Sequence, residues 1–331
     1  MSGGLLQLSG VVVDLVHRLD HLPAPGEEVE TSTFQMTPGG GFNAMAAARR
    51  MGARVTYGGV LGRGPLAEIA LQGLAAEGIA IATQRRAEID QGSCVVVVDA
   101  TGERSFITHH GAEREVDLAH LDSISAAAHG FALLTGYSLY KPKSAAAFLS
   151  WLPGLARPPL LLFDPGPTVA DIPRPTVANA LARADWVSAN ASEAAVLTGE
   201  EDPAEAAAGL AIGRSGALVR RGPDGCWLSH GGLTAHVPGF VVMAIDTNGA
   251  GDAHDGVFMT AMMMGFDPLD AALIANAAAA ISTTRIGPAT SPDATETRHF
   301  LAARGETLAA SRIWERAQPG AKDAPKEEDR E

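Results

Sequence analysis

Short apolar runs rich in β-branched residues alternate with alanine-rich stretches along most of this 331-residue chain. The apolar runs cover residues 55–61, 132–134, 160–163, 186–188 and 216–219. The stretches between them, such as residues 44–51 and 67–77, are typical of helices. This alternation predicts βαβ units, and so a doubly wound α/β fold with a mostly parallel sheet and helices on both faces.

Two stretches, residues 15–36 and 92–110, break the alternation and read as strand pairs without helices. In the second, turn residues at 99–102 separate two extended runs, which predicts a hairpin. We expect these insertions to form a small β-sheet lid over an α/β domain made of residues 1–14, 37–91 and 111–317. Residues 318–331 are rich in Pro, Gly and charge, which predicts a disordered tail.

Composition narrows the class of function. The net charge of −13 argues against a nucleic-acid surface and favours a small-molecule substrate. Cys94 and Cys226 are far apart and lack metal-ligand company, so neither a disulfide framework nor a zinc site is expected, and a reducing cytoplasm fits. The apolar run at residues 5–13 is a poor signal peptide, and no segment is expected to span a membrane.

The string Asp-Thr-Asn-Gly-Ala-Gly-Asp-Ala-His-Asp-Gly at residues 246–256 lies between two apolar runs, residues 241–245 and 257–266. This order predicts a strand, a glycine loop and a helix start. Amides around Gly249, Ala250 and Gly251 can converge on an anion, and the helix N-terminus adds positive charge. Asp252 is then either a base beside an anion pocket, which indicates phosphoryl transfer, or an ordinary N-cap.

This string resembles the second signature, Asp-Thr-x-Gly-Ala-Gly-Asp, of the ribokinase-like (PfkB) carbohydrate kinases. The resemblance implies a ribokinase-like fold and transfer of the γ-phosphoryl of ATP to a substrate hydroxyl, with Asp252 as the catalytic base and Mg²⁺ bridging the phosphates. Many members dimerise through the lid, so a homodimer is expected.

A second family feature is the glycine-rich turn before the helix expected at residues 44–51. Amides of Gly39, Gly40 and Gly41 can donate to sugar hydroxyls, and Asn43 offers a donor and an acceptor to a diol. The alternative is a tight turn with Asn43 as N-cap. In the family spacing Pro38 stands where the first glycine is usual, which removes one amide donor.

Asp14 ends a predicted first strand, residues 11–14, at the edge of the sheet where open α/β folds bind ligands. The resemblance implies that it binds substrate hydroxyls, although an Asp at a strand end is also a common turn former.

Asn190 and Glu193 match the family motif Asn-x-x-Glu, which acts through water on the Mg²⁺ of MgATP. The same spacing is that of a capping box.

The resemblance also assigns residues around the nucleotide. Gly222 and Gly225 match a Gly-x-x-Gly turn that lies along the nucleotide and serves equally as a hairpin turn. Asn276 matches a position that lines the adenine pocket. In addition, the region of Asp246, Asn248 and Ser291 is where some members bind a monovalent cation, so activation by K⁺ is an open expectation.

Two other classes of protein compete with a kinase. Residues 62–67 nearly match the dinucleotide fingerprint of an oxidoreductase, but a complete strand and helix precede them, whereas the first strand–helix turn should carry that motif. No P-loop string occurs. A non-catalytic sugar-binding regulator is the other alternative. His109, His110 and His254 lack metal-ligand company, so surface or packing roles are expected for them.

The acceptor is the least determined part. Ribokinases proper carry an acid after the strand near residue 136, whereas this chain has Gly136-Tyr137 there, which disfavours ribose. A hexose, a sugar acid or another polyol remains open. So does a nucleoside, because Phe42 could stack on a base. We favour a sugar over a nucleoside.

Overall fold

The computed structural model describes residues 3–313 except 87, 102, 308 and 310. Its large sheet has the order β13-β12-β11-β10-β9-β8-β1-β4-β5, and all neighbours are parallel except the β11-β12-β13 edge. The strands are β1 (Gly4–Gln7), β4 (Val55–Tyr57), β5 (Ala80–Ile81), β8 (His129–Thr135), β9 (Leu160–Asp164), β10 (Trp186–Asn190), β11 (Gly216–Arg220), β12 (Gly225–His230) and β13 (Leu233–Pro238). The predicted tail lies outside the described residues.

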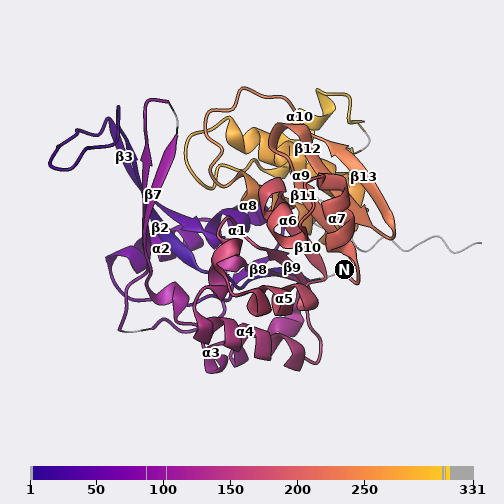
Figure 1. The fold of residues 1–331 in the computed structure, drawn as a ribbon, viewed down its shortest axis with the longest axis horizontal. Helices are drawn as coiled ribbons and strands as arrows, with labels where there is room; N and C mark the ends of the chain where they lie inside the picture. Colours follow the sequence, from indigo (N-terminus) through magenta and orange to yellow (C-terminus); the bar gives the residue numbers. More distant parts are fainter. Residues whose placement is uncertain (1–2, 87, 102, 308, 310, 314–331) are drawn as a thin grey trace, which may run out of the picture.

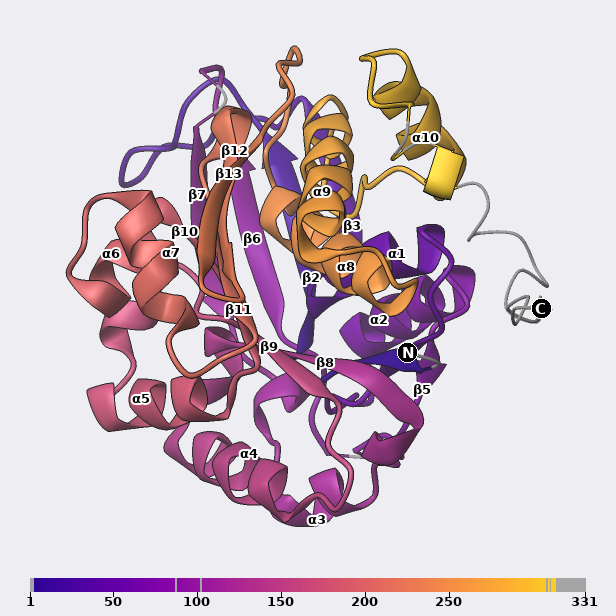
Figure 2. The same ribbon diagram turned by 90° about the vertical axis from the view of Figure 1, so that its right-hand side faces the viewer.

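Helices cover both faces of this sheet (Figure 2). Buried side chains of α1, α2, α8 and α9 form one hydrophobic core, and those of α3 to α7 form another on the opposite face. The doubly wound fold is therefore confirmed. The helices are α1 (Gly41–Arg50), α2 (Pro65–Ala76), α3 (Leu118–Asp122), α4 (Pro142–Gly154), α5 (Arg174–Arg183), α6 (Ala191–Thr198), α7 (Pro203–Ala211), α8 (Ala250–Met263), α9 (Pro268–Thr283) and α10 (Ala294–Ala302). None of them is long and apolar enough to cross a membrane within the described part of the chain.

A second sheet of order β3-β2-β6-β7 stands out from the body of the molecule (Figure 1). We call this sheet the lid. Its strands are β2 (Val11–Arg18), β3 (Thr33–Gly40), β6 (Ser93–Val98) and β7 (Arg104–His109). Asp99 Oδ1 closes the predicted hairpin between β6 and β7, since it accepts from the amides of Thr101 and Glu103 at 2.8 and 3.1 Å.

The lid begins earlier than the sequence predicts, at Val11 instead of residue 15. The first strand along the chain, β1, belongs to the large sheet. After Ser9 and Gly10 the chain continues as β2, which pairs with β3 and β6 in the lid. Asp14 therefore lies midway along a lid strand, and its expected place at the end of a strand of the large sheet is wrong. An apolar run does not itself show where a strand changes partners.

The strand predicted at residues 241–245 is also absent. Val241 and Met243 are 87% and 86% exposed, although both are apolar. β13 is the last strand at this end of the large sheet, and residues 241–245 do not add a further strand to it. Instead the amides of Ile245 and Asp246 donate to the carbonyl of Thr283 at 2.7 and 3.0 Å, and this anchors the segment to the end of α9.

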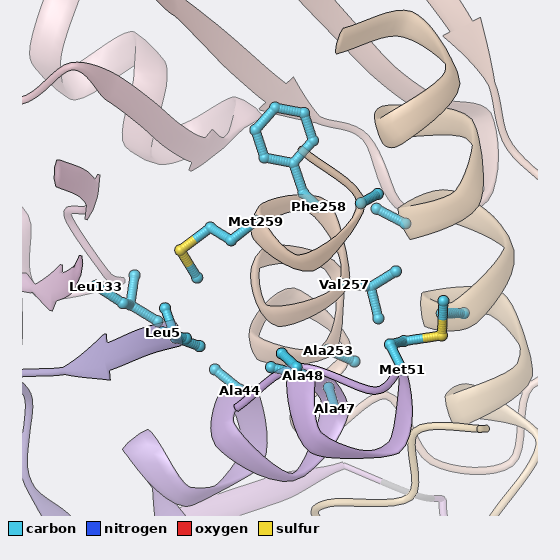
Figure 3. Packing of buried hydrophobic residues seen from close by; sticks show 14 of the residues in the cluster. Leu5, Ala44, Ala47, Ala48, Met51, Leu133, Ala253, Val257, Phe258 and Met259 are labelled. Atoms are coloured by element: carbon cyan, nitrogen blue, oxygen red, sulfur yellow. The ribbon is translucent and has the colours of Figure 1, made fainter. Parts of the chain in front are cut away.

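Small side chains bring α1 and α8 close together. Ala44, Ala47 and Ala48 of α1 face Ala253 and Val257 of α8 (Figure 3). At Gly256 an added Cβ would lie 2.2 Å from the carbonyl oxygen of Ala44, so only glycine allows this crossing. This close packing brings the first turn of α1 beside the first turn of α8.

Candidate functional site

The glycine loop leads directly into α8. Gly249 is the N-cap of α8 with φ at 72°, in the left-handed region that favours glycine, and Asp252 lies within the first turn. The alternative in which Asp252 merely caps the helix is therefore wrong. First-turn amides have no intrahelical partner and carry the positive end of the helix dipole. The amide of Ala250 donates to Thr247 O at 3.3 Å, so the amides of Gly251 and Asp252 are better placed for an anion.

Asp252 and Asn43 are brought together from two motifs. Asn43 Nδ2 donates to Asp252 Oδ2 at 3.0 Å, across 209 positions of sequence. Burial raises the pKa of Asp252 to about 7, the bond from Asn43 opposes this rise, and nearby carboxylates add to it. Asp14 is 7% exposed, and burial, with a smaller effect of the Asp252 charge, raises its pKa to about 7 as well. Both carboxyls thus titrate near neutrality, where a general base is effective.

The glycine-rich turn joins β3 to α1. Gly40, with φ at 60°, is the N-cap and Gly41 is the first residue of the helix, so Asn43 lies inside the first turn and is not the cap. An added Cβ at Gly39 would lie 2.2 Å from Asp14 Oδ2, so the Asp14 carboxylate rests against this backbone. Asn43 Oδ1 is buried and has no hydrogen-bond partner among the described residues. An unpaired buried acceptor beside two carboxyls suits a substrate hydroxyl.

Sequence reasoning missed a buried arginine. Arg220 ends β11, and its Nη2 donates to Asp164 Oδ2 at 2.9 Å. Its guanidinium also lies 3.7 Å from Glu193 Oε2 and 3.4 Å from Asp255 Oδ1. Burial opposes the charge on Arg220, but these three carboxylates outweigh burial and raise its pKa. We call these four residues the Arg220 cluster.

The Arg220 cluster borders the anion loop. An added Cβ at Gly251 would lie 2.7 Å from Arg220 Nη1, so the guanidinium rests directly against the loop. Asp164 and Arg220 are the last residues of two parallel strands, β9 and β11. The carboxyl ends of such strands meet at the ligand-binding edge of the sheet. That signal, applied to every strand instead of to Asp14 alone, would have found both residues.

Asn190 and Glu193 form the capping box that the sequence left open. Asn190 Oδ1 accepts from the Glu193 amide at 2.9 Å, and Glu193 Oε2 accepts from the Asn190 amide at 2.8 Å. Glu193 also belongs to the Arg220 cluster, where three acids share one guanidinium. Among the described residues no group of His, Cys, Asp and Glu forms an all-protein metal cage. An excess of carboxylate without a cage fits Mg²⁺, which keeps several waters in protein sites.

The other residues predicted to contact nucleotide have structural partners. Gly222 and Gly225 belong to the turn between β11 and β12, and at Gly225 an added Cβ would strike the carbonyl of Val237 at 2.2 Å. Asn276 is buried, donates to Val237 O at 3.2 Å and contacts His254 Nε2 at 3.2 Å. The packing role expected for His254 is therefore observed. A role of Asn276 in adenine binding stays a prediction.

The region expected to bind a monovalent cation holds arginines. Asp246 is 4% exposed, and its carboxylate pairs with Arg104 and, at 3.5 Å, with Arg18. The amides of Asn248 and Gly287 donate to the same carboxylate at 2.9 and 3.0 Å. Ser291 Oγ is buried without a hydrogen-bond partner among the described residues.

The dinucleotide alternative fails on geometry. Residues 62–67 lead into α2, and the N-terminus of α2 already binds a carboxylate of this chain. Asp90 Oδ1 accepts from the Ala67 amide at 2.8 Å and Asp90 Oδ2 from the Leu66 amide at 3.2 Å. A pyrophosphate would have to displace this side chain.

Tyr137 lies in the segment after β8, near the place where an acid would be expected in a ribokinase. It follows β8 and is 48% exposed. Burial raises the pKa of its hydroxyl to about 12, and the charges of Asp252, Asp164 and Glu193 contribute. An added Cβ at Gly166 would lie 3.5 Å from Tyr137 Cε2, so the ring lies near the end of β9, two residues after Asp164.

Comparisons with known proteins agree with this geometry. The pfkB family carbohydrate kinase model matches residues 7–295. The chain is 29% identical to the ribokinase of Haemophilus influenzae over 318 residues, which cover 91% of this chain and 99% of that protein. It is 28% identical to the uncharacterized sugar kinase YegV of Escherichia coli over 283 residues, 83% of this chain and 87% of that protein.

Among solved structures, the ribokinase of Thermotoga maritima superimposes with a TM-score of 0.78 at 25% identity. The match covers 90% of this chain and 99% of that one. The anion loop and the glycine-rich turn both lie inside the segment that the family model matches. The chain therefore belongs to the pfkB family of carbohydrate kinases and is a phosphotransferase that acts on a hydroxyl acceptor.

Proposed function

We propose that this protein transfers the γ-phosphoryl group of MgATP to a hydroxyl of a small carbohydrate, with Asp252 as the catalytic base. The observation that carries the proposal is the bond from Asn43 to Asp252, which joins the glycine-rich turn to the first turn of α8. The bond supports the proposal because the Asp252 carboxyl, whose pKa is about 7, lies in the first turn of α8 and contacts the amide whose oxygen is unpaired among the described residues.

Each residue has a distinct part in the proposed reaction. Asn43 holds the Asp252 carboxylate in orientation, and Asp252 accepts the proton of the attacking hydroxyl. The amide of Gly251 and the α8 terminus stabilise charge on the transferred group, while Asp14 and Asn43 Oδ1 bind acceptor hydroxyls. Because the transition state is loose, position and charge neutralisation supply most of the catalysis.

Magnesium supplies charge neutralisation on the phosphates when it is bound. Glu193 and Asn190 would hold it through water, in accordance with the family motif. Arg220 places a fixed positive charge beside Gly251, at the edge of the anion loop. We propose that Arg220 keeps the Asp164, Glu193 and Asp255 carboxylates compatible with an anionic nucleotide, since three uncompensated acids would repel it.

A sugar is favoured over a nucleoside as acceptor. The expectation that Phe42 could stack on a base is wrong, because Phe42 is 5% exposed and packs in the hydrophobic core. The position after β8 offers the hydroxyl of Tyr137 instead of the carboxylate that contacts ribose in ribokinases. A hexose, a sugar acid or another polyol fits this neutral position better than ribose does.

The direct test is release of ADP from MgATP with a panel of pentoses, hexoses, sugar acids and nucleosides. Turnover with a carbohydrate that is lost in Asp252→Asn would establish the reaction and the substrate class. A nucleoside as the best acceptor would favour the alternative reading of the site. Binding of MgATP without turnover on any acceptor would favour a sugar-binding regulator.

We also propose that the protein is a homodimer that associates through the outer face of the lid. Met36, Leu15, Val95 and Ile107 lie in one row across the four lid strands. Met36 and Ile107, at the two ends of this row, are 52% and 67% exposed, so the row presents apolar side chains to solvent on both edge strands. Light scattering should report a dimer that Ile107→Asp converts to a monomer.

A further inference from the structure

The Asp246 carboxylate receives four donors. Oδ1 accepts from Arg104 Nη2 and from the Asn248 amide, and Oδ2 accepts from Arg18 Nη2 and from the Gly287 amide. An ionised carboxylate has about four lone-pair positions, so all of them are taken. Arg104 Nη1 adds a bond to Thr247 Oγ1 at 3.1 Å, which fixes the guanidinium against the same loop.

These contacts do not fit a bound monovalent cation. A cation held by Asp246 would have to displace one of four donors. It would also meet two guanidinium groups that already exceed the single carboxylate charge, so its approach is unfavourable. Among the residues that the structure describes, Ser291 Oγ is a buried oxygen of this region without a hydrogen-bond partner, and one hydroxyl does not replace a carboxylate as counter-charge.

The two arginines come from the lid, whereas Asp246 belongs to the body. Arg18 lies in β2 and Arg104 in β7, and both pair across Val98 of β6, so they occupy one row of the lid sheet. Asp14 and Cys94 pair with each other four positions before Arg18 and Val98, so they lie on the same face of the lid. The lid face that carries Asp14 into the site therefore also carries the two cations that hold Asp246.

Asp246 in turn is three residues before Gly249, the N-cap of α8. Its bonds to the Asn248 and Gly287 amides shape the segment that ends in the anion loop. Lid position and loop shape thus depend on the same carboxylate. A movement of the lid away from the body would leave Asp246 at a buried position without both counter-charges, which is costly for an ionised group.

We propose that Arg104, assisted by Arg18, replaces a monovalent cation as the counter-charge of Asp246 and couples lid closure to the anion loop. The inference rests on the proposed kinase function. Arg104 is on this view a positioning residue, which acts on the phosphoryl group through Asp246 and the loop. It follows that the kinase works without potassium.

The experiment compares wild type, Arg104→Gln and Arg104→Lys with Arg183→Gln, a change of an exposed arginine on α5 remote from the lid. Each is assayed for turnover in KCl and in tetramethylammonium chloride at equal ionic strength. Binding of MgADP by calorimetry is measured in the same two salts, because this arm needs no acceptor. Wild type and Arg183→Gln should differ by less than about 2-fold between the salts in both arms, well below a typical allosteric coupling.

Arg104→Gln should lose about 10-fold or more in turnover in tetramethylammonium, and K⁺ should restore about 5-fold, since Asp246 Oδ1 has then lost its arginine donor and can accept a cation in its place. Arg104→Lys should keep the salt independence with an intermediate rate. A wild type activated strongly by K⁺ would overturn the inference, and so would an Arg104→Gln enzyme that equals Arg183→Gln in both salts.

The two proposals fail in different ways. Absence of turnover on every acceptor would count against the kinase, while MgADP affinity would still respond to salt in Arg104→Gln and not in wild type. If that response is missing although MgADP binds, the coupling through Asp246 is wrong whatever the acceptor. If wild type does not bind MgADP at all, both proposals fail together.

Discussion

Two buried groups of charges flank the anion loop, and they are built in opposite ways. In the Arg220 cluster one guanidinium serves three carboxylates, whereas at Asp246 one carboxylate serves two guanidinium groups. The first is assembled from β9, α6, β11 and α8, all parts of the α/β body. The second connects that body to the lid.

The two groups of charges are therefore suited to different roles. Ion pairs within a packed body hold side chains in place, and they contribute little net stability because desolvation offsets attraction. Ion pairs between two parts of a molecule depend on the distance between those parts, so they can report or control a movement. We therefore expect changes in the Arg220 cluster to alter stability and electrostatics, and changes at Asp246 to alter coupling.

The largest effect is expected at Asp252, which lies between the two groups and belongs to neither. Asp252→Asn should lower kcat by roughly 10²- to 10⁴-fold, the usual contribution of a general base, with little change in MgATP binding. Steady-state kinetics and calorimetry check both. Retention of most activity would remove Asp252 from the mechanism.

Stability is the control for that variant. The folded-state pKa of Asp252 is about 7 against an ordinary value of 3.8, and burial is the main cause. A raised carboxyl pKa means that ionisation disfavours the folded state, so this group costs stability progressively as pH rises from about 4 to about 7. Asp252→Asn should consequently melt no lower than wild type at pH 8, and a clear drop in melting temperature would instead attribute the lost activity to unfolding.

Substitution of Arg220 tests whether the ion pairs within the α/β body affect stability. Arg220→Met leaves three carboxylates without a counter-charge, and it should lower the free energy of unfolding by about 3–5 kcal/mol. The loss should be larger at pH 8 than at pH 5.5, because protonation of Asp164, whose pKa is about 7, relieves the uncompensated charge at lower pH. Urea denaturation at both pH values measures it, and equal losses at the two would contradict the electrostatic cause.

The pH dependence of kcat/KM tests which of the two groups of charges affects the ionisation of Asp252. As a base Asp252 must be ionised, so kcat/KM should fall as pH drops below about 7. Asn43→Leu removes a bond that lowers the pKa of Asp252 and should move this limb to higher pH, whereas Asp255→Asn removes a charge that raises it and should move the limb to lower pH. Arg18→Gln should leave the limb in place, and a shift there would show that both groups act on the base.

The smallest effect is expected for the outer of the two lid arginines. Arg18 is 3.5 Å from Asp246 Oδ2 and its side chain is 27% exposed. Arg18→Gln should lower the free energy of unfolding by no more than about 1 kcal/mol, since solvent screens such a pair. Chemical denaturation checks this. A loss as large as that of Arg220→Met would mean that the Asp246 ion pairs contribute to stability as much as the Arg220 cluster does.

Much of the architecture follows from local pattern. The alternation of apolar runs with alanine-rich stretches determined the doubly wound fold, because strands and helices bury their side chains with different periods. Residues 246–252 determined a loop and a helix start, since glycine at position 249 adopts a backbone angle that other residues avoid. The sequence likewise selected Asn43 and Asp252, although it did not show that they touch.

Contacts between segments that are distant in the sequence became visible only in the tertiary structure. Composition does not show that Phe42 enters the core, that residues 241–245 find no strand to pair with, or that Asp14 lies on a lid strand. Nor does it show that Arg220 is shared among three acids, or that Arg18 and Arg104 meet Asp246. Charge pairing depends on distance in space, and spacing along the chain does not specify that distance until the sheets and helices have packed.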